Sequence, residues 1–494
     1  MSKNGAPVEN RLTIKEVFIM CLGGFGWQVV KKIREILDDT ITDFVLNHRE
    51  VYCNKPDTDF TRNRVFTPQT IISTLFQFES RNTESELINI FDSSYHVGNI
   101  NAALLMQRAK IKNGAFQYLF HSFTDNVLNS GLIKTETPYG YPGDVFLADG
   151  SGVNIARNEK DPSTFVSQKG KKGYNQFHLN ALYDFRSHAF VDSLVQGIHK
   201  KEERQALVMM ISRMDPDKIA LIIADRGYEG YNVFATCIEH NKHFIIRLKD
   251  LYSNGILSSH VHNLPDGEFD LYISTILTRK RSLKTDRTKD IYTVISPNTT
   301  FDFFDENGEY PICFRIVRFK LPNGEYETVA TNLDRVQYDA DTIKELYNER
   351  WNCETAFAKL KYTLGLVNFH SRKMKYIEQE LFVKLTLFNF ISFVMDAVRQ
   401  EQEELYGDFY SSSQDEIQDD RIEIDNDEEK VYRVDLSFSQ AMTTCRRLLK
   451  KDWLQKLEDV IKTIRAHIYK IKLNRTFARN VKPQSWKPFN HRPS

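Results

Sequence analysis

Cysteine is scarce in this chain of 494 residues, and its few positions form no pattern. None of the six cysteines is spaced as Cys-x-x-Cys; they are Cys21, Cys53, Cys237, Cys313, Cys353 and Cys445. A zinc site needs clustered thiolate or imidazole ligands, and a small secreted scaffold needs paired cysteines. The sequence therefore indicates a reducing cytoplasm, without a zinc site or a disulfide framework.

Long apolar runs and a glycine-rich phosphate loop are also missing. Residues 384–398 are apolar, but they fall short of the roughly 20 residues that span a bilayer. Residues 17–30 contain three glycines, run into Lys31-Lys32 and lack a clear small-residue cleavage site. We therefore expect a buried element there, and not a signal peptide. The sequence predicts no membrane segment.

The formal net charge is zero, which by itself gives no sign of a nucleic-acid partner, but this zero is a cancellation. Residues 401–430 carry thirteen acidic side chains against two basic ones, and residues 445–494 carry fourteen basic ones against three acidic ones. We expect the acidic segment to be a disordered linker. In the basic region, residues 431–494, aromatic rings stand among the cations, which suits contact with a nucleic-acid backbone together with base stacking.

The most informative stretch is residues 341–366. Its pattern predicts a helix that Asp341 caps and Gly365 ends. Along it, four polar side chains recur at steps of three, four and seven, which return to the same side at 3.6 residues per turn. These side chains are Tyr347, Arg350, Glu354 and Lys361.

Charges at these steps have an ordinary interpretation, which is a solvated helix face laced with ion pairs. A carboxylate that needs only a salt bridge, however, does not need a phenol and a second cation on the same line. A carboxylate that shares a metal beside a phosphodiester does, because the cations and the phenol then hold the phosphates. For any single residue of the four, both interpretations stay open.

The order Tyr, two residues, Arg, three residues, Glu, six residues, Lys resembles the YREK signature of insertion-sequence DDE transposases, in the family named for insertion sequence four. The match is complete at Tyr347, Arg350, Glu354 and Lys361. The resemblance implies that Glu354 is one of three metal-binding acids and that two aspartates precede it.

Two apolar segments upstream each end in an aspartate. Residues 144–149 predict a short strand ending at Asp149, and residues 218–225 predict a central strand, buried on both faces, ending at Asp225. An aspartate after a strand is often only a turn residue. Asp149-Gly-Ser and Asp225-Arg-Gly-Tyr, however, resemble the family's first and second aspartate motifs, and they occur in the right order.

With a hairpin over residues 177–195 and a buried strand over 243–248, these are the parts of an RNase H-like core. We therefore expect an α/β protein whose RNase H-like catalytic core is interrupted by a β-rich insertion, with helical N-terminal and C-terminal regions. The expected segments are a DNA-end-binding region (1–130), the first part of the core (140–250), the insertion (251–338), the second part of the core with the signature helix (339–400), the acidic linker (401–430) and the basic region (431–494).

A basic loop within the insertion has two interpretations. Its cations are Arg279, Lys280, Arg281, Lys284, Arg287 and Lys289. They form either a solvated turn or a DNA contact beside the catalytic core, and the sequence leaves both open.

The resemblance, which runs from about residue 60 to the C-terminus, implies a DNA transposase. It would cut DNA at the terminal inverted repeats of an insertion sequence and join the 3′ ends to target DNA. Oxygen ligands favour Mg²⁺ or Mn²⁺, and two such ions would be held by Asp149, Asp225 and Glu354. Arg350 and Lys361 would position phosphates, and Tyr347 would contact the cleaved end.

A homodimer in the DNA complex and a bacterial, cytoplasmic, DNA-associated location complete this expectation. Two alternatives remain. One is a metal-dependent nuclease of the same fold that joins no strands, and the other is a DNA-binding derivative that has lost cleavage.

Overall fold

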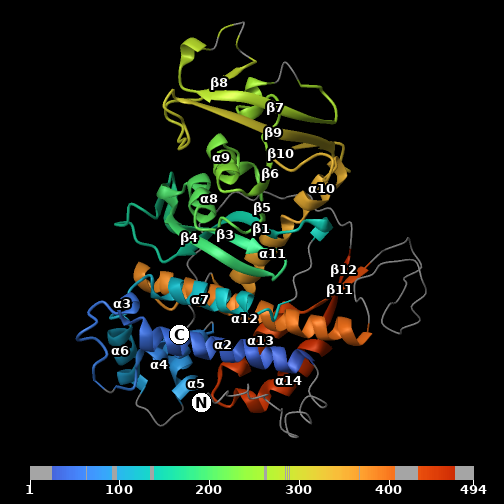
Figure 1. Ribbon diagram of the computed structural model, residues 1–494. Coiled ribbons are helices and arrows are strands. Elements are labelled where there is room, and N and C mark those ends of the chain that lie inside the picture. The colour runs from blue at the N-terminus through green and yellow to red at the C-terminus, as the bar shows by residue number, and fades with distance from the viewer. Residues whose placement is uncertain are drawn as a thin grey trace, which may run out of the picture.

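The computed structural model describes residues 25–472, apart from residues 63, 80, 92–96, 134–137, 261–263, 284, 286–287, 289, 367 and 407–431. This part of the chain has a mixed α/β fold, in which a large mixed sheet stands on a layer of helices (Figure 1). The expected acidic linker and the end of the basic region lie almost wholly outside the described residues.

The sheet contains ten strands within the described residues, in the order β2-β3-β1-β5-β6-β10-β9-β7-β8, with β4 paired to β3. Their bounds are β1 Asp144–Ile155, β2 Phe165–Gln168, β3 Lys171–Asp184, β4 Ala189–Gly197, β5 Ala220–Ala224, β6 His243–Arg247, β7 Phe269–Thr278, β8 Tyr292–Val294, β9 Glu309–Lys320 and β10 Tyr326–Thr331. Strands β1, β5 and β6 are mutually parallel, whereas β3 is antiparallel to both β1 and β4.

Helices cover both faces of the central strands. On one face lie α8 and α9, and on the other lie α11 and α12. The α-helices of the described residues are α2 Phe25–Asn47, α3 Arg49–Tyr52, α4 Pro68–Gln77, α5 Thr83–Phe91, α6 Val97–Arg108, α7 Ala115–Asn129, α8 Glu203–Ile211, α9 Tyr231–Glu239, α10 Ala340–Asn348, α11 Trp351–Ala358, α12 Met374–Tyr406, α13 Phe438–Cys445 and α14 Trp453–Ala466. A short second sheet pairs β11 Tyr432–Leu436 with β12 Ile468–Lys472.

Strand β5 is buried on both faces, as its continuous apolar run predicts. Leu221 and Ile223 join the core shared with α11 and α12, whereas Ile222 and Ala224 join the core under α8 and α9. Successive side chains of a strand point to opposite faces, so a fully covered strand must be apolar throughout.

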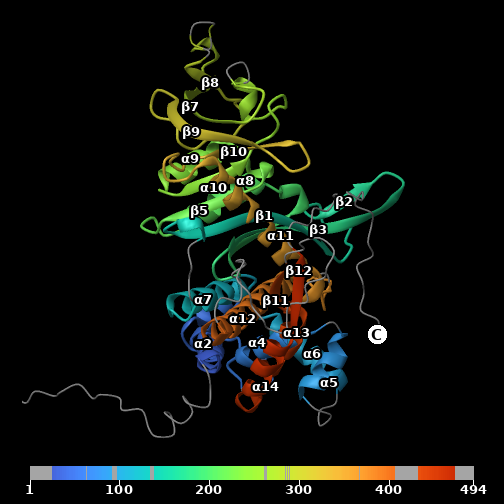
Figure 2. The same cartoon turned by 90° about the vertical axis from the view of Figure 1, so that its right-hand side faces the viewer.

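Helix α12 lies at the centre of the helical layer (Figure 2). It packs against α2, α7 and α13 and also against β4. Among the described residues it is the one helix long and apolar enough to span a membrane, and its apolar stretch is buried inside the protein. The sequence predicts an apolar helix over residues 381–398, which is the middle of this longer element.

Two helix predictions need correction. The sequence predicts a single helix over residues 102–123 that carries a basic rim, and this is wrong, because α6 ends at Arg108 and α7 begins at Ala115. Between them the Lys112 N–H donates to the Tyr52 carbonyl at 2.7 Å, which draws the chain away from a helical path. Arg108 therefore does not lie on a basic rim: it is buried, with Nη1 3.1 Å from Oε1 of Glu380.

The start of α5 differs as well. Thr83 and Glu86 suggest a capping box, but the Ser85 N–H donates to Oδ1 of Asn82 at 2.8 Å, so Asn82 caps this helix. The carboxylate of Glu86 instead accepts from the main-chain N–H groups of Glu79 and Arg81. At α4 the prediction is confirmed, since Thr67 accepts from the Thr70 N–H and Pro68 occupies the first turn.

The strands between residues 251 and 338 extend the main sheet and form no second one. Strand β10 pairs with β6 of the central strands, and β9, β7 and β8 follow outward. The turn between β9 and β10 contains Gly324 with φ 87°, as the Asn-Gly pair predicts for a tight hairpin. These strands form the upper end of the molecule in Figure 1.

Candidate active site

Asp149 and Asp225 follow neighbouring residues on two parallel strands. The register of β1 and β5 pairs Ala148 with Ala224, and each aspartate comes directly after its alanine. Because parallel strands run in the same direction, both carboxylates lie at the same edge of the sheet. The backbone alone therefore brings these two acids side by side.

The local structure of the two aspartates differs. The sequence predicts that β1 ends at Asp149, but this is wrong: β1 continues to Ile155, and Asp149 pairs with Ala181 of β3. Strand β5 does end before Asp225, which caps the following 3-10 turn. In both cases Oδ1 accepts a nearby glycine N–H, from Gly150 at 2.8 Å and from Gly227 at 2.7 Å.

Helix α11 brings Glu354 to the same place by packing against β1. The carboxylate of Glu354 accepts from Nη1 of Arg350, one turn earlier, at 2.6 Å. The pKa of Asp149 reflects its closeness to Arg350, Asp225 and Glu354. Burial raises it to about 7, the Gly150 N–H and the Arg350 charge oppose this, and the carboxylates of Asp225 and Glu354 add to it. The three predicted acids therefore lie within electrostatic reach of one another.

The predicted signature helix is bent and does not run as one regular element. Asp339, and not Asp341, caps α10, by accepting from the Thr342 N–H at 2.8 Å. Between α10 and α11 the Arg350 N–H bonds three residues back, to Tyr347, which tightens the helix at that point. From Lys359 to Thr363 the helix widens into a π turn, and Gly365, with φ 72°, ends it as predicted.

The π turn carries Lys361, so its direction departs from regular helical spacing. Lys361 is half-buried. Burial lowers the pKa of Lys361, and the charge of Asp149 opposes that effect. Among the described residues Lys361 forms no ion pair. Single π turns inside helices occur frequently at functional sites.

Tyr347 and Arg350 are buried, whereas side chains on an open helix face would be exposed to solvent. Tyr347 is 3% exposed and Arg350 is 6% exposed. The guanidinium carbon of Arg350 lies 5.8 Å from the ring centre of Tyr347 and 5.0 Å from that of Trp351, whose side chain is exposed. Arg350 thus links the phenol to the carboxylate of Glu354.

Sequence reasoning missed a fourth carboxylate at this place, that of Glu203 in the first turn of α8. Its Oε1 lies 3.0 Å from Nε2 of His178 and 2.8 Å from Nζ of Lys201. Hydrogen bonding from His178 is the main cause that lowers the pKa of Glu203 to about 2. The two glycines beside it reflect its position, because a Cβ at Gly150 or at Gly227 would come within 3.0 Å of the Glu203 carboxylate.

No group of three or more histidine, cysteine, aspartate or glutamate side chains is already arranged as a metal centre in the described residues. One oxygen of each aspartate is bonded to a glycine N–H, and Glu354 is bonded to Arg350. The second oxygens of Asp149 and Asp225 accept no hydrogen bond from the described chain. Three hard oxygen donors on one side of the sheet match the ligand preference of Mg²⁺ or Mn²⁺.

Two cations of the predicted basic loop, Arg279 and Lys280, contact other parts of the protein, whereas Arg281 is exposed. Arg279 donates to the carbonyls of Pro297 and Thr299, and Lys280 lies 3.9 Å from Glu309. Three of its other cations, Lys284, Arg287 and Lys289, lie outside the described residues. DNA contact by this loop stays a prediction.

Comparison with known proteins bears on this geometry. A family model described as "Transposase DDE domain" matches residues 140–390, which span all three acids and the signature helix. No protein of curated function matches the sequence. Among solved structures, the chain is similar to the piggyBac transposase in its synaptic complex with hairpin DNA, with 12% identity and a TM-score of 0.42 over 90% of this chain and 86% of that one.

Proposed function

The chain belongs to the family of transposase DDE domains, and from this premise we propose that it cuts DNA at the ends of an insertion sequence and joins the 3′ ends to target DNA. One observation carries the proposal. Asp149 and Asp225 stand side by side at one edge of the sheet, and Glu354 reaches them from α11. This is the constellation that metal-assisted phosphoryl transfer requires.

The fold class proposed for the catalytic part is RNase H-like. Its support is the strand order β4-β3-β1-β5-β6, in which β3 is antiparallel to its neighbours and β1, β5 and β6 are parallel. The arrangement sets two acids at adjacent positions on the neighbouring strands β1 and β5 and leaves the third to a later helix. In this proposal residues 140–250 and 339–400 form the catalytic core.

Two Mg²⁺ or Mn²⁺ ions are proposed as cofactors, held by Asp149, Asp225 and Glu354. The raised pKa of Asp149 supports this, because burial and, to a smaller extent, the carboxylates of Asp225 and Glu354 disfavour its charged form, which a cation would stabilise. Bound divalent ions would activate the attacking oxygen and stabilise the leaving one. The glycine N–H groups at Gly150 and Gly227 fix one oxygen of each aspartate, so that the other is free to face the ions.

Arg350, Lys361 and Tyr347 are proposed to act on the DNA side of this site. Arg350 compensates the charge of Glu354 in the DNA-free protein. Its planar guanidinium can also hold a phosphate through two hydrogen bonds. Lys361 has no ion pair among the described residues and lies near Asp149, which suits a phosphate contact. Tyr347 orients Arg350 from within the core, and contact with the cleaved end is its proposed second role.

The partners in this proposal are the terminal inverted repeats of the element and the target DNA, with two copies of the chain in the complex. The cell compartment is the bacterial cytoplasm. The same acids would also serve a nuclease that joins no strands. A DNA-binding derivative without cleavage is disfavoured by the grouping of all three acids.

A direct experiment uses linear DNA that carries the reading frame with its natural flanks. The purified protein is added with Mg²⁺ or with a chelator, together with a supercoiled target plasmid. The transposase predicts cuts at the boundaries of the element and joined products in the target, both of which need Mg²⁺. Cuts without joined products would favour the nuclease, and the absence of both would contradict the proposal.

A further inference from the structure

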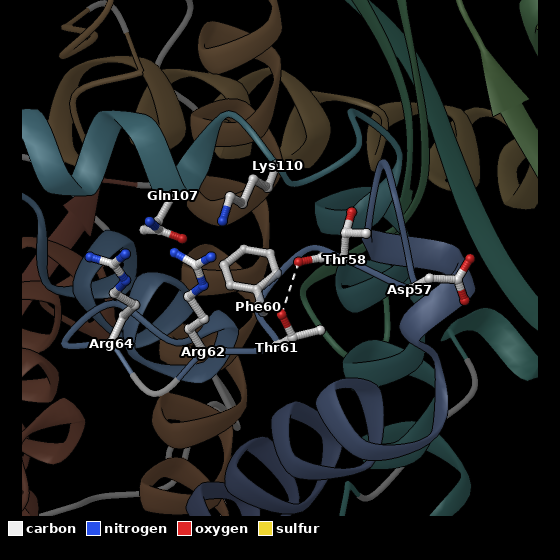
Figure 3. A pocket seen from close by; sticks show the side chains of 8 residues that line it. All are labelled: Asp57, Thr58, Phe60, Thr61, Arg62, Arg64, Gln107 and Lys110. Atoms are coloured by element: carbon white, nitrogen blue, oxygen red, sulfur yellow. Dashed lines mark hydrogen bonds between the residues drawn. The ribbon is translucent and has the colours of Figure 1, made fainter.

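A basic hollow lies on the helical layer, between the loop after α3 and the C-terminal end of α6. It is lined by Asp57, Thr58, Phe60, Thr61, Arg62, Arg64, Gln107 and Lys110, and it encloses about 360 Å³. Figure 3 shows the side chains of Arg62 and Arg64 reaching from the loop toward those of Gln107 and Lys110, while Asp57 stands apart from them. Three cations therefore face one space from two sides.

The loop that carries this hollow is firmly built. Arg49 donates to the carbonyls of Pro56 and Asp59, and the buried carboxylate of Asp59 accepts from the Lys55 N–H at 2.9 Å. The Asn54 N–H donates to the Lys110 carbonyl at 2.9 Å, which ties the loop to the residue that follows α6. These bonds anchor the first part of the loop, residues 54–59, beside the end of α6.

Phe60 holds an unusual conformation at the centre of the hollow (Figure 3). Its φ is 59°, in the left-handed region that a bulky side chain rarely adopts. Nζ of Lys110 lies 5.4 Å from the centre of its ring. Strained backbone of this kind persists where the surrounding structure fixes it, and it clusters at binding sites. The ring gives Lys110 a defined position beside the two arginines.

The three cations have no acidic partner in the part of the chain that the structure describes. Within the described residues Arg62, Arg64 and Lys110 form no ion pair and donate no side-chain hydrogen bond. Both arginines are exposed, and Asp57 is the one acid in the lining. Sites for drug-sized molecules are lined mostly by apolar groups, whereas this lining is cationic and hydroxylic. Such a lining suits an exposed anion that carries repeated negative charges.

We propose that this hollow binds the phosphodiester backbone of DNA, at a site separate from the three carboxylates. The inference rests on the proposed function, because that function supplies the DNA. Arg62, Arg64 and Lys110 would each contact phosphate oxygens, and the Gln107 amide would add a hydrogen bond. Backbone contacts fix the position of a protein on DNA and carry no sequence information of their own.

The test measures DNA binding by the full chain with fluorescence anisotropy in a chelator, so that no cleavage occurs. The probes are a labelled duplex with the sequence that flanks the reading frame and a duplex of shuffled sequence. The test variant is the triple change Arg62→Ala, Arg64→Ala and Lys110→Ala. A charge-matched control removes three exposed lysines outside the basic C-terminal region that form no ion pair in the described chain: Lys160→Ala, Lys200→Ala and Lys218→Ala.

We expect the test variant to bind both duplexes on the order of tenfold more weakly or worse. The slope of log affinity against log salt should fall by about 0.9 for each lost phosphate contact, or by roughly 2.7 for all three. The control should lose much less. Equal losses in test and control variants, or an unchanged slope in the test variant, would overturn the proposal.

Cleavage of the flanking duplex in Mg²⁺ separates this inference from the proposed function. If the wild type cleaves and the test variant binds DNA normally, the DNA-binding role of the hollow is refuted and the proposed transposase function is supported. If the test variant loses DNA binding and the wild type cleaves in no divalent ion, the DNA-binding role of the hollow is supported and the proposed transposase function is refuted.

Discussion

At the residue scale, the carboxyl of Asp149 makes the candidate site sensitive to pH. Burial raises its pKa to about 7, far above the value of about 3.9 expected in the unfolded chain. The folded protein therefore binds this proton more tightly than the unfolded chain does. Stability contributed by the protonated carboxyl is present below about pH 4 and is lost as the pH rises to about 7.

The first prediction applies to the protein in the presence of a chelator, so that no divalent cation binds the Asp149 carboxylate. Asp149→Asn carries no charge to bury, so its stability relative to wild type should increase between about pH 4 and 7 and stay level above that. The full difference is roughly 4 kcal/mol, at about 1.4 kcal/mol for each pH unit of the window. Urea unfolding at a series of pH values measures it. A difference that is independent of pH would show that the Asp149 carboxylate is well solvated.

Arg350 and Lys361 allow a second prediction, because they differ in what they touch. Arg350→Lys should slow cleavage while the Mg²⁺ requirement persists, since an ammonium cannot replace a planar guanidinium between Glu354 and a phosphate. Lys361→Ala should weaken binding of end DNA by about 1.5–3 kcal/mol, the range for hydrogen bonds to charged groups.

Melting temperature and cleavage rate measured on the same two variants decide this point. If both cations serve only the fold, stability will change and cleavage per folded molecule will not. That outcome would contradict the role in positioning phosphates. Cations that serve only the fold would pair with neighbouring helix acids such as Glu345 or Glu349, but neither cation does so in the described chain. Glu349 instead accepts from Tyr139 and Asn352.

At the element scale, the third prediction concerns Gly150 in β1. A Cβ at Gly150 would lie 2.9 Å from Cε1 of His178 and 3.0 Å from Oε1 of Glu203. Gly150→Ala should therefore destabilise the fold by about 1–3 kcal/mol, as overpacking of a filled site does. Urea unfolding measures the change.

A matched control exists at Gly114, where a Cβ would meet nothing within 4 Å and φ is −68°. Gly114→Ala should be neutral or stabilising by about 0.4–1 kcal/mol. The double variant Gly150→Ala, His178→Ala should regain part of the loss. If Gly150→Ala proved as harmless as Gly114→Ala, the close packing of Glu203 and His178 on β1 would be wrong.

Elements with a strong local signal were predictable from the sequence. The apolar run of β5, the Asn-Gly hairpin before β10 and the Thr67-Pro68 start of α4 each depend on neighbouring residues alone. The break between α6 and α7 was not, because it depends on a hydrogen bond from Lys112 to a carbonyl sixty residues away in the chain. The continuation of β1 past Asp149 depends likewise on pairing with β3.

The same division holds for the site. Asp149, Asp225 and Glu354 carry a spacing and a local context that resemble a family pattern. Glu203 has neither, and its place beside Gly150 and Gly227 appears only when α8 is folded onto the sheet. The burial of Tyr347 and Arg350 was equally out of reach, since it depends on which face of α10 and α11 meets the core.

At the scale of the whole molecule, the helices of residues 25–129 have no core of their own. The buried side chains of α2, α4 and α7 share one cluster with those of α12 and α14. Asn389 of α12 donates to the hydroxyl of Thr124 in α7 at 2.8 Å, and Arg34 of α2 donates to the Leu448 carbonyl. The N-terminal and C-terminal helices therefore form a single layer.

A fourth prediction follows from this shared core. A fragment of residues 1–130 should lack a cooperative thermal transition, because α12 no longer covers its apolar faces. Circular dichroism during heating, with the full chain as the control, measures this. A sharp transition in the fragment would mean that the region folds by itself and that the shared core contributes little to its stability.

The most direct test of the central claim, that three acids on two strands and one helix form one catalytic site, is the rate at which single-residue variants cleave end DNA in Mg²⁺. Asp149→Asn, Asp225→Asn and Glu354→Gln should each abolish cleavage while DNA binding persists. Asp341→Asn removes an exposed acid without an ion pair from the first turn of α10, and it should cleave at the wild-type rate. Normal cleavage by any one of the three variants would contradict the account for that residue, and normal cleavage by all three would refute the site.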